Sequence, residues 1–153
     1  MSHPLAFANQ CIYHGRILLA GWRHAGAEHA EPAEQVALAY APAVRKQFLD
    51  AYGWLLLAAC RIRQVPEQPP HSVQDLPALP AGLVRPAEVD ACALLEHDGW
   101  VAALKRPITR ASLSHRPGQL ASDVSGIEIR HFEAWLAQIE GLAQLIADAI
   151  DES

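Results

Sequence analysis

Apolar residues recur along this chain at steps of three and four, and no segment shows the alternation of Val, Ile and Thr that is typical of strands. The stretch from Trp54 to Cys60 is apolar at every position. A helix through this stretch is hydrophobic all round, and such a helix has to be enclosed by other helices or by a subunit contact. The pattern therefore predicts an all-α fold with this segment at its centre.

Two long helices are predicted in the N-terminal part of the chain. Residues 5–30 form the first helix, with an apolar face made of Ala8, Cys11, Ile12, Gly15, Leu18, Leu19 and Trp22. Tyr13 and Ile17 lie towards its other side and indicate a second, smaller contact. The second helix begins near Pro32. We expect a kink or a break at Pro42, because proline removes a backbone donor and clashes with the preceding turn.

A proline-rich connector and a third helix follow. Six of the eleven prolines fall within residues 65–86, so this segment is predicted to be extended and stiff, without a full helix. Its apolar side chains are expected to pack along the helices; they are Val73, Leu76, Leu79 and Leu83. A third helix opens at Pro86 and ends at Pro107. A bend or a recapping point is expected within it at Asp98-Gly99.

The last helix carries the most regular pattern. Ser125 and Glu128 form an S-x-x-E capping box, in which each side chain binds a backbone N–H at the helix start. Apolar residues then recur at the spacing of bundle helices: Ile129, Phe132, Leu136, Ile139, Ala143, Ile146 and Ile150, with Trp135, Leu142 and Leu145 beside them. Residues 1–153 are therefore expected to form one all-α domain, an antiparallel bundle of four principal helices with a long proline-rich connector.

Composition and charge narrow the classes of function. With 153 residues, 51% of them hydrophobic, the chain fits one domain that folds without a disulfide or a metal. Its 3 cysteines lie far apart, lack metal-ligand spacing and indicate a reducing compartment. The formal net charge of −5 argues against nucleic-acid and anionic-membrane partners. Neither a signal-peptide pattern nor the ~20 apolar residues of a membrane span is present, so we expect a cytoplasmic protein without a cofactor.

Several histidines are candidate metal ligands. Glu128 and His131 form an E-x-x-H on the last helix, the unit that di-iron carboxylate bundles use, but that chemistry takes a second copy and further glutamates. His14, His24 and Glu28 form another set, in which His24 and Glu28 are four residues apart and can share a helix face. Solvated side chains are common near a helix end rich in Gly and Ala. A plain polar surface is therefore favoured over a metal site.

A basic segment offers a candidate anion-binding or catalytic site. Residues 99–122 contain no acidic residue but include Lys105, Arg106, Arg110 and Arg116, a local positive field that can hold a phosphate or another anion. Arg110 and His115 match the R-x4-H pattern of HEPN-type ribonucleases, which are themselves helical bundles. Ala follows Arg110, where that family usually has a polar residue, and the motif falls in a loop rich in Ser and Pro. A basic loop that offsets the acidic last helix is therefore favoured over a nuclease.

Short motifs occur along most of the chain: Asn9-Gln10-x-x-Tyr13, Tyr52-Gly53-x-Leu55, Leu95-Glu96-x-Asp98-Gly99-Trp100 and a late helix with Trp135. With these motifs the chain resembles a family of short all-helical proteins from pseudomonad-type bacteria, known only as a domain of unknown function. Pro42 departs from the family pattern, in which the second helix has no proline. The resemblance implies an all-helical protein of the bacterial cytoplasm, and it supplies no activity and no catalytic residue.

These observations favour a binding or scaffolding role. The sequence carries no nucleotide-binding loop, nucleophile motif or zinc-ligand pattern. We therefore expect a non-catalytic scaffold, or a module that binds a protein or a small molecule. A homodimer is expected, because the all-apolar segment and the side of the first helix with Tyr13 and Ile17 both need cover. The alternative class is an enzyme, either a HEPN-like ribonuclease or a metal-dependent bundle enzyme.

Overall fold

The computed structural model describes residues 3–110 and 128–153 of the chain, and every regular element in them is helical. In chain order these are α1 (Pro4–Glu28), α2 (Ala33–Ala59), the 3-10 turn η1 (Val73–Asp75), α3 (Ala87–Asp98), α4 (Trp100–Lys105) and α6 (Ile129–Asp151). No strand occurs in this part of the chain, so the prediction of an all-α fold is confirmed. None of its helices combines the length and the apolar content that a membrane span requires.

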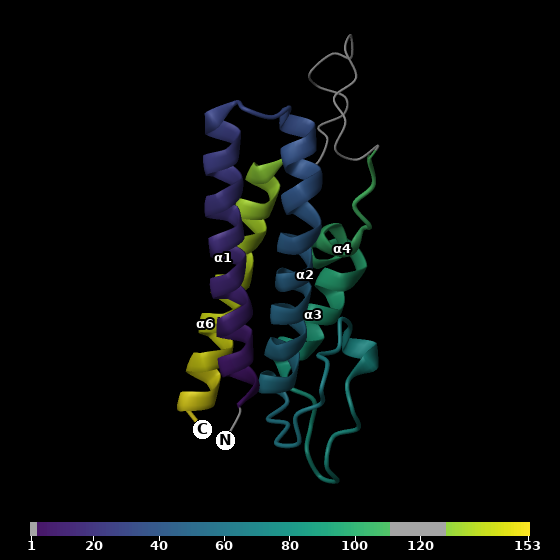
Figure 1. Cartoon of the computed structure of the whole chain (residues 1–153). Coiled ribbons are helices and arrows are strands. Elements are labelled where there is room, and N and C mark those ends of the chain that lie inside the picture. Colours follow the sequence, from purple (N-terminus) through teal and green to yellow (C-terminus); the bar gives the residue numbers. More distant parts are fainter. Residues whose placement is uncertain (1–2, 111–127) are drawn as a thin grey trace.

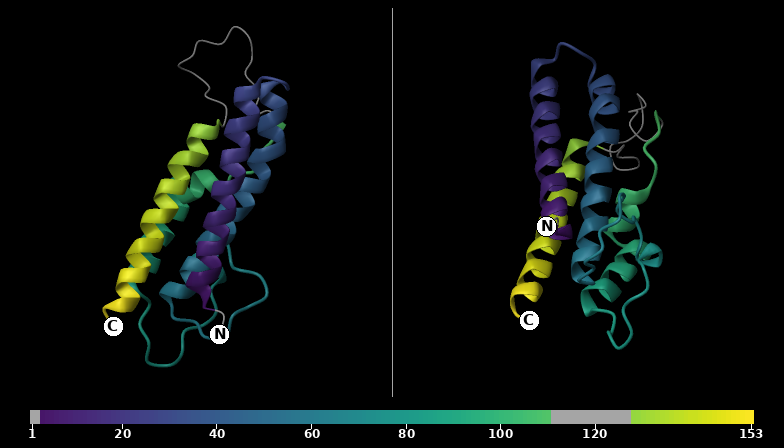
Figure 2. Two further views of the ribbon diagram at one scale, coloured as in Figure 1. Left: turned by 60° about the vertical axis from the view of Figure 1, so that its left-hand side comes forward. Right: turned by 60° about the horizontal axis from the view of Figure 1, so that its bottom comes forward.

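Three long helices, α1, α2 and α6, lie side by side and enclose the main core (Figure 1, Figure 2). α1 runs in the opposite direction to α2 and α6, and the short link 29–32 joins it to α2. α3 and α4 lie on the side of α2 that faces away from α1 (Figure 1, Figure 2). α2 contacts each of the other described helices and is therefore the central element of the fold.

α2 is central because its C-terminal half is apolar on nearly every side. All residues from 48 to 58 are buried. Leu55 and Leu57 belong to the main core with α1 and α6, whereas Tyr52 and Leu56 belong to a second core with η1, α3 and α4. The segment that was expected to need cover on every side is thus enclosed within one chain.

α1 buries the face that its sequence predicts. His3 caps its start, since His3 Nδ1 accepts a hydrogen bond from the Leu5 N–H at 3.1 Å. The buried residues on the predicted face are Ala8, Ile12, Gly15, Leu19 and Trp22. Gly15 allows the close approach of α2, because a Cβ there would lie 2.4 Å from Phe48 Cε1.

Of the kink or break predicted at Pro42, the break is wrong. α2 continues through Pro42, which is itself exposed, while Ala41 and Val44 beside it are fully buried. A proline inside a helix costs about 3 kcal/mol, because it removes a backbone hydrogen bond and crowds the preceding turn. Burial of the apolar residues on both sides of Pro42 outweighs this local cost.

The helix interruption predicted at Asp98-Gly99, as a bend or a recapping point, is confirmed: Gly99 caps two helices. α3 ends at Asp98 and α4 begins at Trp100, with Gly99 extended at φ −109° and ψ −160°. The Gly99 N–H still donates to the Leu95 carbonyl at 2.9 Å, so this residue closes one helix and starts the next.

The connector lies directly against α2. At Gly53 the approach is so close that a Cβ would lie 1.8 Å from the Pro70 carbonyl oxygen. The next residue, His71, places its Nε2 2.8 Å from Asp50 Oδ1 on α2. Only glycine leaves room for the main chain of the connector at this point.

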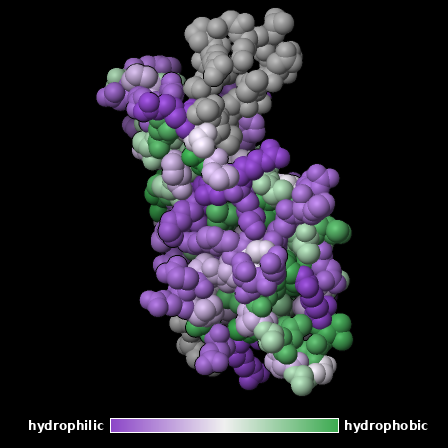
Figure 3. All heavy atoms as spheres, turned by 90° about the vertical axis from the view of Figure 1, so that its right-hand side faces the viewer, coloured by the Kyte–Doolittle hydropathy of each residue, from purple (hydrophilic) through white to green (hydrophobic). Residues whose placement is uncertain are grey.

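The later part of the connector is more exposed than predicted. Leu76 and Leu79 pack against the second core, but Leu83 is 59% exposed and Val84 is 88% exposed. The packing predicted for Leu83 is therefore wrong. Figure 3, which faces the connector, α3 and α4, shows hydrophobic atoms gathered toward the lower end of this side.

α6 begins later than predicted. Glu128 is its N-cap, with φ −114° and ψ 166°, and the Glu128 N–H donates to His131 Nδ1 at 2.8 Å. The capping box predicted from Ser125 is wrong, because Glu128 precedes the helix, and Ser125 lies outside the described residues. The predicted apolar row is buried at Phe132, Ile139, Ala143 and Ile146. Leu145, predicted to widen this row, is 53% exposed.

Replacing Gly53 by Ala tests the contact between the connector and α2. The added methyl group clashes with the Pro70 carbonyl, and overpacking of this kind costs typically about 1–3 kcal/mol of unfolding free energy. Gly141→Ala is the matched control, because no described atom lies within 4 Å of a Cβ added at Gly141. At this exposed position of α6, replacing Gly by Ala is expected to raise the unfolding free energy by about 0.5–1 kcal/mol. Urea unfolding measures both, and a Gly53→Ala protein as stable as wild type would contradict the contact.

Candidate functional site

An open cleft lies between the connector, α3 and the end of α4. Its volume is about 590 Å³, and it is lined by Ser72, Val73, Gln74, Arg85, Ala93, Glu96, His97 and Lys105. The connector supplies residues 72–74 and 85, α3 supplies Ala93, Glu96 and His97, and α4 supplies its last residue. Because these segments lie far apart in the sequence, only the tertiary fold brings their polar side chains together.

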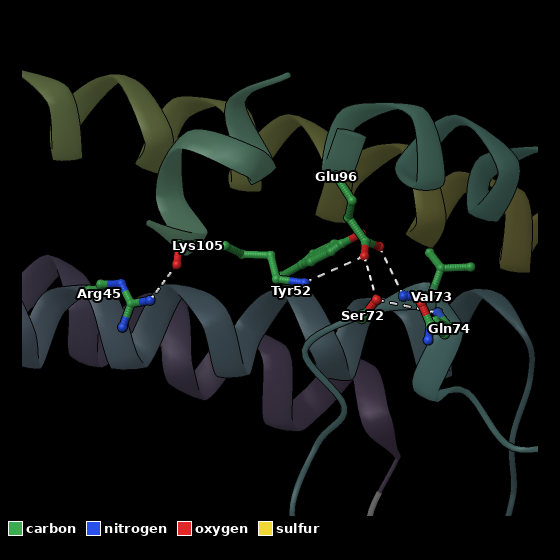
Figure 4. A network of polar contacts seen from close by, with 7 residues as sticks. All are labelled: Arg45, Tyr52, Ser72, Val73, Gln74, Glu96 and Lys105. Carbon is green, nitrogen blue, oxygen red and sulfur yellow. Dashed lines mark hydrogen bonds and ion pairs between the residues drawn. The ribbon is translucent and has the colours of Figure 1, made fainter. Parts of the chain in front are cut away.

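Glu96 is the polar centre of the cleft (Figure 4). Its Oε1 accepts a hydrogen bond from Ser72 Oγ at 2.6 Å. Its Oε2 accepts from the Val73 N–H at 2.9 Å and from the Tyr52 hydroxyl. Lys105 Nζ lies 3.6 Å from Oε1, and the Glu96 side chain is 11% exposed. One carboxylate on α3 therefore ties together α2, the connector and α4.

These contacts set the protonation states inside the cleft. Burial raises the pKa of the Glu96 carboxyl, but hydrogen bonds from Ser72, Tyr52 and the Val73 N–H outweigh burial, so this pKa lies below its usual range. Burial, aided by the hydrogen bond to Glu96, raises the pKa of the Tyr52 phenol well above its usual value. At neutral pH Glu96 is therefore ionised and Tyr52 keeps the proton that it donates.

Arg45 holds the end of α4 beside the cleft. Its Nε donates to the Leu104 carbonyl at 3.1 Å, and its Nη2 donates to the Lys105 carbonyl at 2.7 Å (Figure 4). The last carbonyls of a helix have no partner within the helix, and a cation is favourable at this end. The main chain of Lys105 is thus fixed by α2, while its side chain lines the cleft.

Positively charged side chains line the cleft. Arg85 Nε lies 3.1 Å from Asp90 Oδ1 in an exposed pair, which water screens. Lys105 lies 3.6 Å from Glu96, at ion-pair distance but beyond a good hydrogen bond. His97 lines the same space from the last turn of α3. Both oxygens of Glu96 already accept hydrogen bonds, so this carboxylate is poorly placed to take a proton from a substrate. The cations of the lining can instead contact a negatively charged ligand.

A second buried carboxylate, Asp50, ties the connector to α2. Its Oδ2 lies 2.6 Å from Lys46 Nζ, and its Oδ1 lies 2.8 Å from His71 Nε2. Burial, together with the negative charge of Asp50, raises the pKa of the Cys11 thiol. A protonated thiol is a poor nucleophile, so this cluster holds structure rather than offering a reactive group.

The predicted metal ligands are not brought together. His24 Nε2 and Glu28 Oε1 lie 3.6 Å apart on α1, but their side chains are 79% and 62% exposed. His14 precedes His24 by ten residues of the same helix, about 15 Å along its axis. His131 Nδ1 already accepts the hydrogen bond at the start of α6. Within residues 3–110 and 128–153, no group of three His, Cys, Asp or Glu side chains is placed to hold a metal ion.

The predicted anion-binding and nuclease residues are described only in part. Lys105 lines the cleft, whereas Arg106 and Arg110 are exposed. His115 and Arg116 lie outside the described residues. The pairing of Arg110 with His115 therefore stays a prediction, and one member of the predicted anion-binding set is placed in the cleft.

Sequence reasoning missed the role of Glu96, although the pattern contains a signal for it. Val89, Cys92 and Glu96 follow each other at steps of three and four along α3, and the first two are buried. A carboxylate in a buried row needs partners, because leaving it unpaired is costly. Its partners Ser72 and Tyr52 are 24 and 44 residues away in the sequence, which no local pattern reveals.

Replacing Glu96 by Gln tests the carboxylate as the tie between α3 and the connector. The amide keeps the shape of the side chain but removes the charge that strengthens the hydrogen bonds from Ser72 and Tyr52. We expect a loss of about 1.5–3 kcal/mol of unfolding free energy at neutral pH. Glu67→Gln, at an exposed position of the connector, is the matched control and is expected to change stability little.

The pH dependence of this loss identifies the charge as its cause. Because folding lowers the pKa of Glu96, the stability that the carboxylate contributes is fully present above the ordinary value of 4.5. It is lost as the pH falls through the lower pKa of the folded state. Urea unfolding of the wild type and of Glu96→Gln between about pH 7 and about pH 3 measures how the difference in their unfolding free energy changes with pH. A difference that does not shrink below the ordinary pKa would show that the charge is not responsible.

Comparison of the chain with protein-family models, with curated proteins and with solved structures finds no match in any of the three. The family resemblance drawn from short motifs therefore stays a prediction, and no activity is carried over from a relative. What the protein can do is inferred from its own side chains.

Proposed function

We propose that the protein is a non-catalytic binding module of the cytoplasm whose ligand site is the cleft between the connector, α3 and α4. Its framework is an antiparallel four-helix bundle, in which α3 and α4 together act as the fourth helix. Residues 65–86 act as the connector that closes one side of this bundle.

One observation carries the proposal: the carboxylate of Glu96, whose side chain is 11% exposed, is fully used in holding the walls of the cleft. Its two oxygens receive hydrogen bonds from the Ser72 hydroxyl, the Tyr52 hydroxyl and the Val73 N–H. A general base needs a free lone pair directed at its substrate, and a pKa near the working pH. Glu96 meets neither need, because its oxygens are occupied and its pKa is lowered.

The cysteines support a non-catalytic role. Burial raises the pKa of the Cys11, Cys60 and Cys92 thiols, that of Cys92 to about 11. The nucleophile in cysteine chemistry is the thiolate, which is scarce at neutral pH when the pKa is raised. These residues act as small apolar side chains of the two cores.

Assays of RNA cleavage and metal content test the proposal against the two enzyme alternatives. The purified protein is expected to leave a panel of RNAs intact and, after dialysis, to hold less than an equivalent of zinc, iron or manganese per chain. RNA cleavage that His115→Ala abolishes without changing thermal stability would establish the ribonuclease instead. A full equivalent of metal that His24→Ala removes would establish the metal-dependent enzyme.

We also propose that the module forms a homodimer through the outer face of α1. Tyr13 and Ile17 are one turn apart on this face and are 58% and 52% exposed. Exposed apolar side chains at this spacing favour a two-fold symmetric contact between copies of a chain. Residues 54–60 do not need a second chain for cover, because other parts of the same chain cover them.

Sedimentation equilibrium tests the dimer. One chain has a mass of 16.7 kDa, and we expect the average mass to rise towards twice this value as the loading concentration increases. Ile17→Glu is expected to keep the protein at the mass of one chain. Leu94→Glu, at a position on α3 that is 74% exposed, is the control and is expected to leave association unchanged. A mass of 16.7 kDa at every concentration would contradict the dimer.

A further inference from the structure

Three nitrogen-bearing side chains line the cleft from three different elements. Arg85 comes from the connector, His97 from α3 and Lys105 from α4. We propose that they bind a small molecule that carries two negative charges on phosphate or carboxylate oxygens. This inference rests on the proposed function as a binding module, and it names the chemical class of the ligand.

The two cations retain donors for a ligand. A guanidinium group has five N–H donors, and the pair between Arg85 Nε and Asp90 Oδ1 engages one of them. An ammonium group has three donors, and Lys105 Nζ lies 3.6 Å from its nearest carboxylate oxygen, on Glu96. The Arg85–Asp90 pair is exposed and contributes little. The Lys105–Glu96 contact is long at 3.6 Å, so an oxyanion can add a closer contact to Lys105.

Glu96 offsets the charge of Lys105 only in part, because neutral donors inside the wall also stabilise its carboxylate. Its carboxylate points at Ser72, Val73 and Tyr52 (Figure 4), and the hydrogen-bond dipoles of these donors offset its charge. Because both of its oxygens are held inside the wall, the charged side chains of the lining that are left to meet a ligand are Arg85 and Lys105. Two cations facing one space favour a ligand with two negative charges.

The size and polarity of the cleft further limit the chemical class of the ligand. A volume of about 590 Å³ lies within the range of small-molecule sites. None of the described side chains that line it is Phe, Tyr or Trp, so it offers no aromatic platform on which a nucleotide base could stack. A phosphate ester or a dicarboxylate fits this lining better than a nucleotide. Arg106 directly follows Lys105 in the chain and is exposed, so it adds positive charge next to the last residue of α4.

Nuclear magnetic resonance of the 15N-labelled full chain tests the proposal. The protein is titrated with inorganic phosphate and, separately, with succinate, at an ionic strength kept constant with sodium chloride. Saturable shifts are expected for the amides of Ser72, Val73 and His97. Shifts with phosphate alone identify a phosphate ligand, shifts with succinate alone identify a dicarboxylate, and either result supports the proposal.

Charge variants show whether the cleft itself binds the probe. Arg85→Gln and Lys105→Gln are each expected to weaken binding about tenfold or more, because each removes a charge-assisted contact. Lys105→Arg keeps the charge and is expected to keep the binding. Arg63→Gln, at an exposed position outside the cleft lining, is the matched control and is expected to bind as wild type does. Thermal melts establish that each variant is folded.

Two results overturn the proposal. The first is the absence of saturable shifts with both probes, and the second is equal weakening by Arg63→Gln and Arg85→Gln, which marks non-specific screening. If either occurs while the protein cleaves no RNA and holds no metal, the binding module stands and only the ligand class is wrong. Cleavage of RNA overturns the binding module itself.

Discussion

The fold depends on the enclosure of α2. Its residues 48–58 are buried on all sides, so one layer of neighbouring helices is not enough to cover it. α1 and α6 cover one side with long helices and the larger core. On the other side, α3, α4 and η1 build the second core around Tyr52 and Leu56. The chain therefore has a thick side made of long helices and a thin side made of short ones.

The side with the short helices α3 and α4 is held to α2 by side-chain hydrogen bonds as well as by apolar packing. α3 has 12 residues and α4 has 6, and helices of this length have little stability of their own. Three side chains make up for this. Glu96 binds η1 and α2, Arg45 binds the last carbonyls of α4, and Asp50 binds the connector. The cleft lies where these ties, rather than apolar packing, hold the connector and the short helices together.

Local sequence patterns predicted the helices and their buried faces. Contacts between residues far apart in the sequence determined the course of α2 at Pro42 and the role of Glu96. The buried faces of α1 and α6 and the helix interruption at Asp98-Gly99 follow from helical spacing and from glycine at a helix end. Of the kink or break predicted at Pro42, the break was wrong, because burial of apolar residues on both sides outweighs the local cost of a proline inside a helix. Of the candidate site, the sequence indicated only Lys105, since Glu96 acquires its role from partners far along the chain.

The contact at Gly53 also determines the geometry of the cleft. The Pro70 carbonyl occupies the space that a side chain would take at Gly53, and this fixes where the connector passes over α2. Two residues later, Ser72 reaches Glu96. A shift of the connector by one residue would leave a carboxylate that is 11% exposed without this donor, which is costly for a buried charge. The glycine on α2 thus fixes the connector wall of the cleft, because it admits the Pro70 carbonyl oxygen and so places Ser72 beside Glu96.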